Sequence, residues 1–408
     1  MPLPTAALPR EDVTLLPSPL IEFIRLGLEH SAIPLTSGQP HPSCYPLTEL
    51  ATAASEAIRG EGERHLRYGA NRGLGKLRAL VNKELINRSL FPPDLSPDSL
   101  VLTVGAQGAF DLLCQAVLRP GEAVALDAPC YPDTWCTVVR RGGKVIPIPV
   151  DAEGMDVDAL EGALHQGIRP RLVYTIPTYQ NPTGCSLSRE RSSRLVALAE
   201  RFDFLVVLDD PYRLLPLDEP LRSGEEFFPW KGWDSGRVVA LGSFSKILAP
   251  GLRVGWAHAA PELADALATL QEMSHISLPA LDALAVASFL EHHGLEGQIQ
   301  RVRTFLQGQR AALIDAMAEA RLEELGCGTM ASAGGCFLGL VLPAGREASP
   351  VARTLAADFG VATVPERAFW PPHGEGTPDR FLRLSFSWAT PEEFRRSAQA
   401  FRQVLTTP

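Results

Sequence analysis

The sequence has no apolar run of the roughly 18 to 20 residues that a transmembrane helix needs, so a membrane-spanning protein is not expected. It has no run of basic residues and its formal net charge is −9 at pH 7, which argues against nucleic acid or an anionic membrane as partner. Its first residues lack the charged-then-apolar order of a signal peptide. We therefore expect a cytoplasmic protein.

The seven cysteines show neither CxxC spacing nor neighbouring histidines, so neither a disulfide framework nor a metal site is expected. Internal repeats and low-complexity segments are also missing. Hydrophobic residues make up 45% and charged residues 21%, as in ordinary globular proteins. A length of 408 residues exceeds what one compact core usually holds, which favours one large domain and a smaller one.

Apolar runs alternate with helical patterns in the middle of the chain. The predicted strands are LVLTV, EAVALDA, KVIPIPV, RLVYTIP, FLVVLDD and RVVALGSFS. A helical pattern, AQGAFDLLCQAVL, follows the first strand, and SRERSSRLVALAERF separates RLVYTIP from FLVVLDD. This alternation predicts an α/β fold with a mainly parallel central sheet covered by helices. Such sheets bind ligands at the carboxyl ends of their strands.

The pattern changes near residue 290. A long helical stretch over residues 296–325 precedes short strands and helices, the last of them TPEEFRRSAQAFRQVL. We predict a large domain over residues 46–289 and a small α+β domain over residues 290–408. Residues 1–45, with one helical stretch at SPLIEFIRLGLEH, are expected to pack with the small domain.

Polar and small residues follow four of the predicted strands. They are the stretches GAQG (105–108), YQNPTG (179–184), DDPY (209–212) and GSFSK (242–246). Each stretch alone is explained by a turn, a helix cap or a polar loop. Together they offer a helix start for a phosphate, an amide, a carboxylate with a tyrosine, and a lysine among hydroxyls.

Pyridoxal 5'-phosphate (PLP) is a cofactor that uses all of these groups. It needs a lysine for a Schiff base, an acid against its pyridinium nitrogen, donors at its phenolic oxygen and a phosphate pocket. A carboxylate keeps the ring nitrogen protonated because an opposite charge favours the charged form. A lysine amine above the substrate Cα can move a proton as base and acid.

The sequence resembles the fold-type I, class I/II aminotransferases from about residue 33 to its end. The stretches SFSKILAPGLRVGW, QNPTG, DDPY, YGANRGLGKLR and LRLSFS occur in the order and spacing of that family. The branch that contains the 2-aminoadipate and aromatic transaminases is the most similar. The resemblance implies PLP as cofactor, a homodimer, and transfer of an amino group between an L-amino acid and a 2-oxo acid.

The resemblance also implies roles for single residues. It implies that Lys246 is the Schiff-base lysine, that Asp209 rather than Asp210 meets the pyridine nitrogen, that Tyr212 and Asn181 bind the phenolic oxygen, and that Tyr131 stacks on the ring. The residues that it places around the phosphate are Ala106, Gln107, Ser243, Ser245 and Arg253, with Tyr68 reaching the phosphate in the neighbouring subunit. It also implies that Arg383 pairs with the substrate α-carboxylate beside Gly38. Four of these residues have a structural alternative: Tyr131 as a core aromatic, Arg383 as a strand-edge charge, Ser245 as packing, and Tyr68 in a local turn.

The sequence departs from the family pattern in three places. The arginine that pairs with acidic substrate side chains in the 2-aminoadipate enzymes aligns with Ile21, and Arg25 lies one turn further on. Ala106 has no hydroxyl for a phosphate. In VPERAFW, Glu366 and Arg367 add charge: Glu366 is either a solvent-facing loop charge or a partner for a cationic, guanidino-like substrate, while the neighbouring aromatic residues permit an apolar or aromatic one.

Two other functions compete with transamination. The same fold hosts PLP-dependent lyases, cyclising synthases and O₂-using enzymes, because fold and cofactor do not set the reaction. The branch also resembles the effector-sensing domain of a family of transcription regulators. We disfavour that function because the N-terminal segment is expected to leave no room for a DNA-binding domain, and no basic patch is present.

Overall fold

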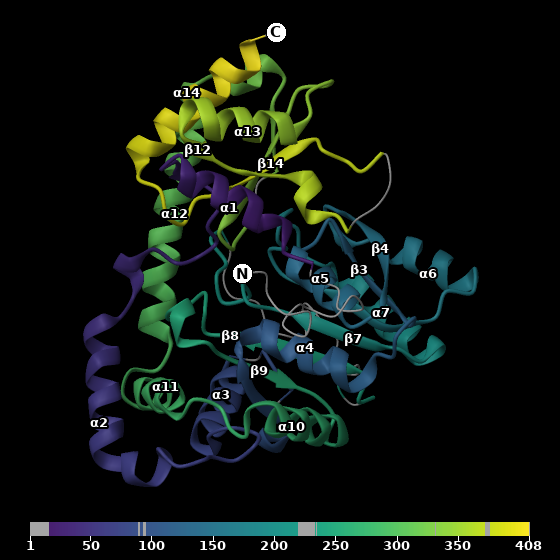
Figure 1. The fold of residues 1–408 in the computed structure, drawn as a ribbon, viewed down its shortest axis with the longest axis vertical. Helices are drawn as coiled ribbons and strands as arrows, with labels where there is room; N and C mark the ends of the chain where they lie inside the picture. The colour runs from purple at the N-terminus through teal and green to yellow at the C-terminus, as the bar shows by residue number, and fades with distance from the viewer. Residues whose placement is uncertain are drawn as a thin grey trace, which may run out of the picture.

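The computed structural model describes residues 16–88, 90–92, 95–218, 233, 235–330, 332–371 and 376–407. Residues 1–15 of the predicted N-terminal segment lie outside the described residues. Two sheets occupy the two ends of the molecule, and the long helix α12 (Glu296–Glu319) runs along one side between them (Figure 1). No helix within the described ranges is long and apolar enough to cross a lipid bilayer.

The larger sheet has eight strands. Their order is β2 (Leu100–Val104), β9 (Val254–His258), β8 (Val238–Ser243), β7 (Leu205–Asp209), β6 (Pro170–Thr175), β3 (Ala123–Ala128), β4 (Lys144–Asp151) and β5 (Gly154–Met155). The strands from β8 to β4 pair in parallel, while β9 is antiparallel to both neighbours and β5 to β4. The mainly parallel α/β sheet is thus confirmed, with β9 as a strand that the sequence analysis missed.

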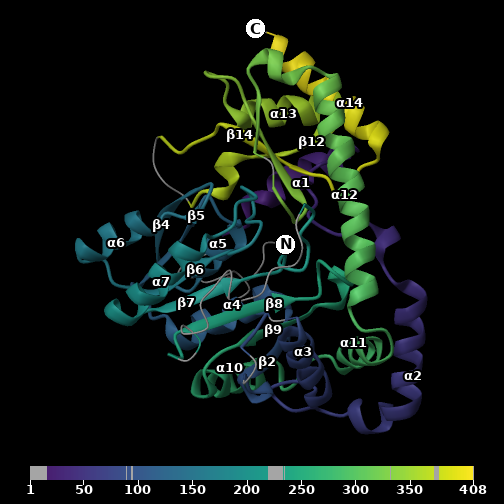
Figure 2. The same cartoon turned by 180° about the vertical axis from the view of Figure 1, so that it is seen from behind.

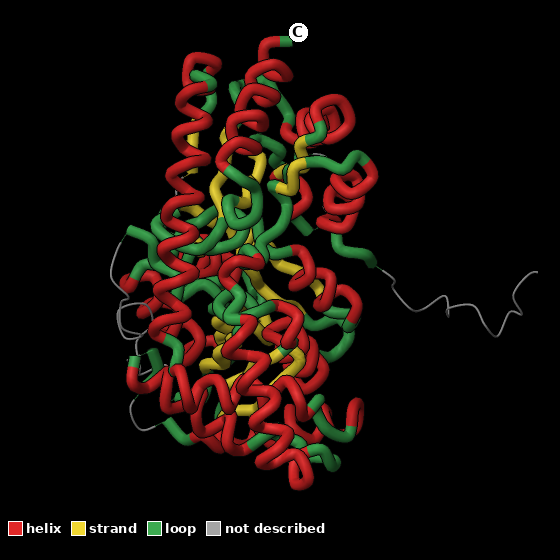
Figure 3. Tube along the Cα trace, turned by 90° about the vertical axis from the view of Figure 1, so that its left-hand side faces the viewer, coloured by secondary structure: helices red, strands yellow, loops and turns green. Residues whose placement is uncertain are grey.

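Helices cover both faces of this sheet because its strands are apolar on both sides. In β3, Val124 and Leu126 belong to the core under α4 (Gly105–Val117), α5 (Pro132–Arg140) and α10 (Pro261–His275). Ala125 points to the opposite core, under α6 (Val157–His165) and α7 (Arg189–Phe202). The period of two residues therefore sorts each strand into two cores. Figure 3 shows strands flanked by helices on both sides.

Three further helices complete the lower half. The second face of the sheet around β2 is covered by α3 (Gly75–Asn87) and α11 (Ala280–His293), which share a core with Leu100 and Leu102. Helix α2 (Leu47–His65) runs beside α11 at the edge of the molecule (Figures 1 and 2). All seven cysteines are free thiols.

The smaller sheet is antiparallel. Its strands are β10 (Gly328–Met330), β11 (Phe337–Val341), β14 (Phe381–Ser385) and β13 (Val364–Pro365), and α13 (Ala348–Phe359) and α14 (Pro391–Thr406) pack on it. The predicted helix over residues 296–325 ends earlier, at Glu319, because Arg321 has a left-handed φ of 54° and a 3₁₀ turn follows. This arrangement places β14, with Arg383, above the larger sheet.

The N-terminal segment lies against this smaller sheet unit. Helix α1 (Pro19–Glu29) contacts α13, and β1 (Ile33–Pro34) pairs in parallel with β12 (Val361–Ala362). Gly27 allows the close approach, because a Cβ there would lie 2.7 Å from the Cβ of Ala362. The domain boundaries at residues 45 and 289 stay a prediction.

Candidate active site

A cavity of about 700 Å³ opens at one edge of the larger sheet. The parallel strands β2, β6, β7 and β8 all end at this edge, so the residues that follow them meet there. Arg253 precedes β9, and because β9 runs the opposite way its first residue lies at the same edge. All the candidate site residues except Tyr68 line this one cavity.

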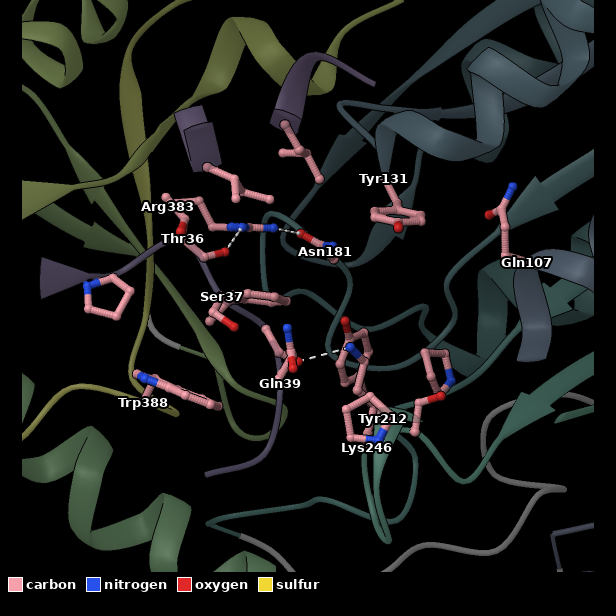
Figure 4. Close-up of a pocket in the computed structure, with 18 of the residues that line it drawn as sticks. Thr36, Ser37, Gln39, Gln107, Tyr131, Asn181, Tyr212, Lys246, Arg383 and Trp388 are labelled. Carbon is pink, nitrogen blue, oxygen red and sulfur yellow. Dashed lines mark hydrogen bonds between the residues drawn. The ribbon is translucent and has the colours of Figure 1, made fainter. Parts of the chain in front are cut away.

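Lys246 follows β8 and extends into the cavity (Figure 4). Its Nζ donates a hydrogen bond of 2.9 Å to the carbonyl oxygen of Gly38 and lies 5.9 Å from the ring centroid of Tyr212. Burial lowers the pKa of the Lys246 ammonium. A lowered pKa increases the fraction of free amine, which is the form that attacks a carbonyl or accepts a proton.

Asp209 and Asp210 point to different surroundings at the end of β7. The Oδ2 atom of Asp209 accepts a hydrogen bond of 2.6 Å from the Tyr174 hydroxyl, while its Oδ1 atom is buried without a partner. Asp210 instead pairs with Arg213 and accepts from the Thr178 hydroxyl. Burial raises the pKa of Asp209 to about 6. An unsatisfied buried carboxylate oxygen favours a donor in the cavity, as a protonated ring nitrogen would be.

Small residues bring the start of α4 close to β9. Gly105 has a φ of 71°, and a Cβ there would lie 2.4 Å from Nη2 of Arg253. A Cβ at Gly255 would lie 2.6 Å from the Cα of Gly105. The two glycines therefore set the distance between the helix start and the arginine. The backbone N–H groups of a helix start and a guanidinium suit a phosphate.

Hydroxyl groups complete this end of the cavity. Ser243 Oγ lies 2.8 Å from Ser245 Oγ and accepts from the Ser245 backbone N–H at 3.1 Å. Arg253 Nη1 donates to Ser245 Oγ at 3.4 Å, and its Nη2 to the Val104 carbonyl at 3.2 Å. Arg253 has a φ of 50°, a left-handed conformation that is unfavourable for a residue with a side chain. The local fold thus holds a strained arginine against Ser245, which Ser243 positions in turn.

The Gln107 side chain is held by α5. Its side-chain Nε2 donates to the Thr137 hydroxyl at 2.8 Å and to the Asp133 carbonyl at 3.3 Å, both in α5. The side chain thereby ties α4 to α5, and the backbone N–H groups at the start of α4 remain for a ligand. Ala106 also lines the cavity but has no polar side-chain atom.

Arg383 on β14 is a buried cation whose protein partners are all neutral. Nη1 donates to Asn181 Oδ1 at 2.9 Å and Nη2 to the Thr36 carbonyl at 2.6 Å, while Nε has no partner (Figure 4). The rings of Phe337 and Phe369 lie 4.1 and 4.9 Å from the guanidinium carbon. Burial lowers the pKa of Arg383 to about 10. A desolvated cation without a carboxylate partner attracts an anionic ligand.

The same contacts explain Asn181 and Gly38. Arginine only donates, so Asn181 turns its oxygen to Arg383 and keeps its Nδ2 donors for a ligand. A Cβ at Gly38 would lie 2.4 Å from Cζ of Phe337, so a side chain there would displace the ring from Arg383. Burial raises the pKa of the Tyr212 hydroxyl well above its ordinary value, which keeps that hydroxyl a neutral donor.

Two candidate tyrosines have different environments. Tyr131 lines the cavity beside Arg383 and Asn181 in Figure 4, and its hydroxyl donates to Asp133. Tyr68 follows α2, is 82% exposed and does not line the cavity of its own chain. Its predicted role would need a second copy of the chain.

The structure adds residues that the sequence analysis did not single out. Tyr174 binds Asp209, Phe337 covers Arg383, and Gln39 and Trp388 line the cavity. The face of α1 that carries Leu20, Ile24, Gly27 and Leu28 forms one wall. Tyr174 is a buried core residue of β6 like Leu172, and the sequence gives no separate signal for its contact with Asp209. The helical period of SPLIEFIRLGLEH predicted helix α1, but the side of the helix that faces the cavity depends on tertiary packing.

Two expectations about charge are corrected. Glu366 is buried, and its carboxylate accepts from the Arg380 backbone N–H at 2.7 Å, so it faces neither solvent nor the cavity. Arg25 does not substitute for the arginine aligned with Ile21, because its Nε binds Glu29 at 2.8 Å. Neither Ile21 nor Arg25 lines the cavity. Within the described ranges, no group of three or more His, Cys, Asp or Glu residues is placed to hold a metal ion.

Comparison with known proteins agrees with this set of groups. The model of the family described as aminotransferase class I and II matches residues 31–401. The chain belongs to the class I and II aminotransferases. It is 30% identical over 393 residues to aromatic-amino-acid aminotransferase 1 of Thermococcus litoralis, covering 95% of this chain and 91% of that protein. It is 31% identical over 393 residues to 2-aminoadipate transaminase of Thermus thermophilus, covering 95% and 94%.

Solved structures of the family have the same fold. Pyrococcus horikoshii kynurenine aminotransferase, in complex with PMP, superposes with a TM-score of 0.88 at 28% identity, covering 98% of this chain and 97% of that one. This aminotransferase is therefore a PLP-dependent enzyme of fold type I that transfers an amino group. Three features fit that cofactor and an amino acid substrate. They are the Asp209 Oδ1 atom without a partner, the buried Arg383 cation, and the start of α4, whose close approach to β9 depends on glycines.

Proposed function

We propose that this aminotransferase moves an amino group between an L-amino acid and a 2-oxo acid, with Lys246 as the residue that transfers the proton at the substrate Cα. The observation that carries the proposal is one cavity that holds an amine of lowered pKa, a carboxylate oxygen without a partner and a buried guanidinium without a counter-ion. These three groups match the Schiff-base lysine, the ring-nitrogen acid and the carboxylate-binding arginine of the family.

PLP, when bound, supplies the carbonyl that condenses with an amine and the electron-withdrawing ring that accepts negative charge. Asp209 would hold the ring nitrogen through Oδ1, and its ionised form is favoured once a positive charge sits beside it. Asn181 Nδ2 and the Tyr212 hydroxyl would donate to the phenolic oxygen, with Tyr131 against the ring face. Ala106, Gln107, Ser243, Ser245 and Arg253 would hold the phosphate.

Arg383 orients the substrate, and Lys246 acts on it. The guanidinium binds the α-carboxylate beside Gly38 and fixes the rotation about the substrate Cα, an orientation effect. Lys246 Nζ removes the proton from Cα in one half-reaction and returns one in the reverse sense with the 2-oxo acid. The Phe337 and Phe369 rings exclude water from the guanidinium, which strengthens its pairing with a carboxylate.

We further propose a cytoplasmic homodimer in which Tyr68 reaches the neighbouring subunit's phosphate site. The segment after α2 lies beside the end of α10, where Asn71 donates to Glu272 at 2.9 Å. Leu66, Tyr68, Met273 and Ile276 are exposed in this region. Exposed apolar side chains on these two neighbouring segments support association with a second copy.

The experiment is a half-reaction on the purified holoenzyme. Addition of one amino acid without an oxo-acid acceptor should bleach the visible absorbance of the bound cofactor and release one equivalent of 2-oxo acid. Lys246→Ala should lose at least about 10³-fold in that rate, because the general base and the covalent attachment are both removed. Release of ammonia or uptake of O₂ with continued turnover would contradict the proposal and favour a lyase or an oxidase.

A further inference from the structure

The half of the cavity that remains after the cofactor and α-carboxylate positions is largely apolar. Its walls come from α1, through Leu20, Ile24 and Leu28, from Ala362 of β12, and from Trp388 after β14. Figure 4 shows Trp388 on the side of Arg383, away from Gln107 at the other end of the cavity. A substrate held by Arg383 would therefore direct its side chain along these walls.

The arginine side chains that line the cavity lie away from the position of the substrate side chain. The cavity lining contains two guanidiniums, of which Arg383 faces the α-carboxylate position and Arg253 lies at the start of α4. On α1, Arg25 turns away to Glu29. The polar side chains that also line the cavity near these walls, Ser31, Ser37 and Gln39, carry only neutral hydroxyl or amide groups. No described lining residue thus provides a cation for a second carboxylate.

Trp388 is held in place by its neighbours. Its ring lies edge-on to His41 at 5.8 Å, and His41 stacks on Phe305 at 5.1 Å. The Nδ1 atom of His41 lies 3.2 Å from the Ser43 backbone nitrogen and 2.8 Å from the Ser43 hydroxyl oxygen, and His41 itself does not line the cavity. The Trp388 ring is therefore held by its neighbours before a substrate enters, and His41 contributes no group to the cavity lining.

We infer that this aminotransferase selects amino acids with a large uncharged side chain and rejects those with a second carboxylate, such as glutamate and 2-aminoadipate. The inference rests on the proposed function and narrows its substrate class. A side-chain carboxylate would lose its hydration against Ile24 and Trp388 without gaining an ion pair, which is strongly unfavourable. An apolar or aromatic side chain would gain by burial at the same surface.

The test compares two amino acid classes on wild type and two variants at one position. Half-reaction rates would be measured with L-phenylalanine, L-leucine, L-glutamate and L-2-aminoadipate. Calorimetry on the holoenzyme would give the affinities of 3-phenylpropanoate and glutarate, which cannot react. Ile24→Arg places a guanidinium in the wall, and Ile24→Met gives a long side chain without the charge.

We expect wild type to favour L-phenylalanine over both dicarboxylic amino acids by at least roughly 100-fold in kcat/KM, and 3-phenylpropanoate over glutarate in binding. Ile24→Arg should raise kcat/KM for L-glutamate by about 10-fold or more, and Ile24→Met should not. Trp388→Ala should lower kcat/KM for L-phenylalanine by about 10-fold. Wild-type rates with L-glutamate or L-2-aminoadipate that equal or exceed those with L-phenylalanine would overturn the inference. Absence of bleaching with every amino acid would instead refute the proposed function.

Discussion

Arg383 is buried and Asp209 is half-buried with its Oδ1 atom out of solvent, and neither forms an ion pair with another described residue. Asp209 has one satisfied oxygen and one orphaned oxygen, and Arg383 donates only to neutral groups. Such groups destabilise the folded chain and gain a partner only when ligands bind. The electrostatics at Asp209 therefore favour a cationic group and those at Arg383 an anionic one, as the proposed function requires.

The first prediction concerns Asp209→Asn. The pKa of Asp209, about 6 in the folded state against an ordinary 3.8, means that the folded state binds this proton more tightly. The unfolding free energy of the cofactor-free wild type should therefore fall as pH rises from about 4 to 6. At pH 8 the cofactor-free Asn variant should be more stable than wild type by about 1 to 3 kcal/mol, and the difference should vanish near pH 4.

Urea denaturation at several pH values measures this difference. The same variant should gain less stability than wild type when PLP is added, because Asn cannot balance the charge of the ring nitrogen. Equal stabilisation of both proteins by the cofactor would show that Asp209 does not face that nitrogen.

The second prediction concerns Gly38→Ala. The new methyl group would meet the Phe337 ring, which would move from the Arg383 guanidinium. We expect KM for amino acids to rise about 10-fold, with a smaller change in kcat, because carboxylate binding is weakened in ground and transition states alike. Steady-state kinetics measures both constants. An unchanged KM would mean that Phe337 does not position Arg383.

At the scale of elements, one reversed strand makes the proposed phosphate site possible. The residues that follow the parallel strands all lie at one edge of the sheet. Because β9 runs in the opposite direction, the residue that precedes it, Arg253, lies at the same edge. Arg253 thereby meets the residue before α4, Val104, and Ser245 after β8. The glycines at 105 and 255 let helix and strand approach closely enough for this contact.

The third prediction is that Gly255→Ala weakens cofactor binding. Its Cβ would collide with the backbone of Gly105, so α4 must shift away from Arg253. We expect PLP affinity to fall by roughly 10-fold or more, and the melting temperature of the cofactor-free protein also to fall. Gly162→Ala in α6 is the matched control, because nothing lies within 4 Å of its added methyl group. It should keep full affinity and gain up to about 1 kcal/mol of stability.

At the scale of the whole molecule, one cavity depends on chain segments that are far apart in sequence. Arg383 belongs to the smaller sheet and Gly38 to the N-terminal segment. Asp209 ends strand β7 of the larger sheet, and Asn181 lies in the loop after its strand β6. The hydrogen bonds from Arg383 to Asn181 and Thr36 join all three parts. The proposed dimer would add a fourth contribution, Tyr68 from a second copy.

The fourth prediction tests that contribution by subunit mixing. Lys246→Ala and Tyr68→Ala homodimers should each be impaired, Tyr68→Ala through weaker phosphate binding. Unfolding and refolding an equal mixture should give mixed dimers in which one site carries both changes and the other carries neither. Activity should then recover to roughly a quarter of wild type, since about half the dimers are mixed and each has one intact site. Activity no higher than the average of the two parents would contradict a shared site.

Much of the larger sheet could be predicted because its strands are apolar on both faces and are punctuated by polar ends. Lys246, Asp209 and Asn181 follow such strands, so local pattern and family resemblance both led to them. Strand β9 escaped because Gly255 and His258 interrupt its apolar run. The side of α1 that faces the cavity could not be predicted because it depends on packing against Ala362 of β12, which is distant in sequence. The burial of Glu366 could not be predicted because it depends on a hydrogen bond from the backbone of Arg380, which lies later in the chain, directly before β14.

The helix α1 wall has a consequence for how this enzyme can change over evolutionary time. The proposed catalytic and binding residues Lys246, Asp209 and Arg383 lie on the sheets or shortly after their strands. The surface proposed to contact the substrate side chain lies instead on a short N-terminal helix, which is held by a two-residue strand and by the packing of Gly27 against Ala362. Drift in that helix leaves proton transfer intact. A new preference can thus be acquired by altering a few residues between 20 and 28, and a chimera that exchanges this helix between relatives should carry the donor's preference with it.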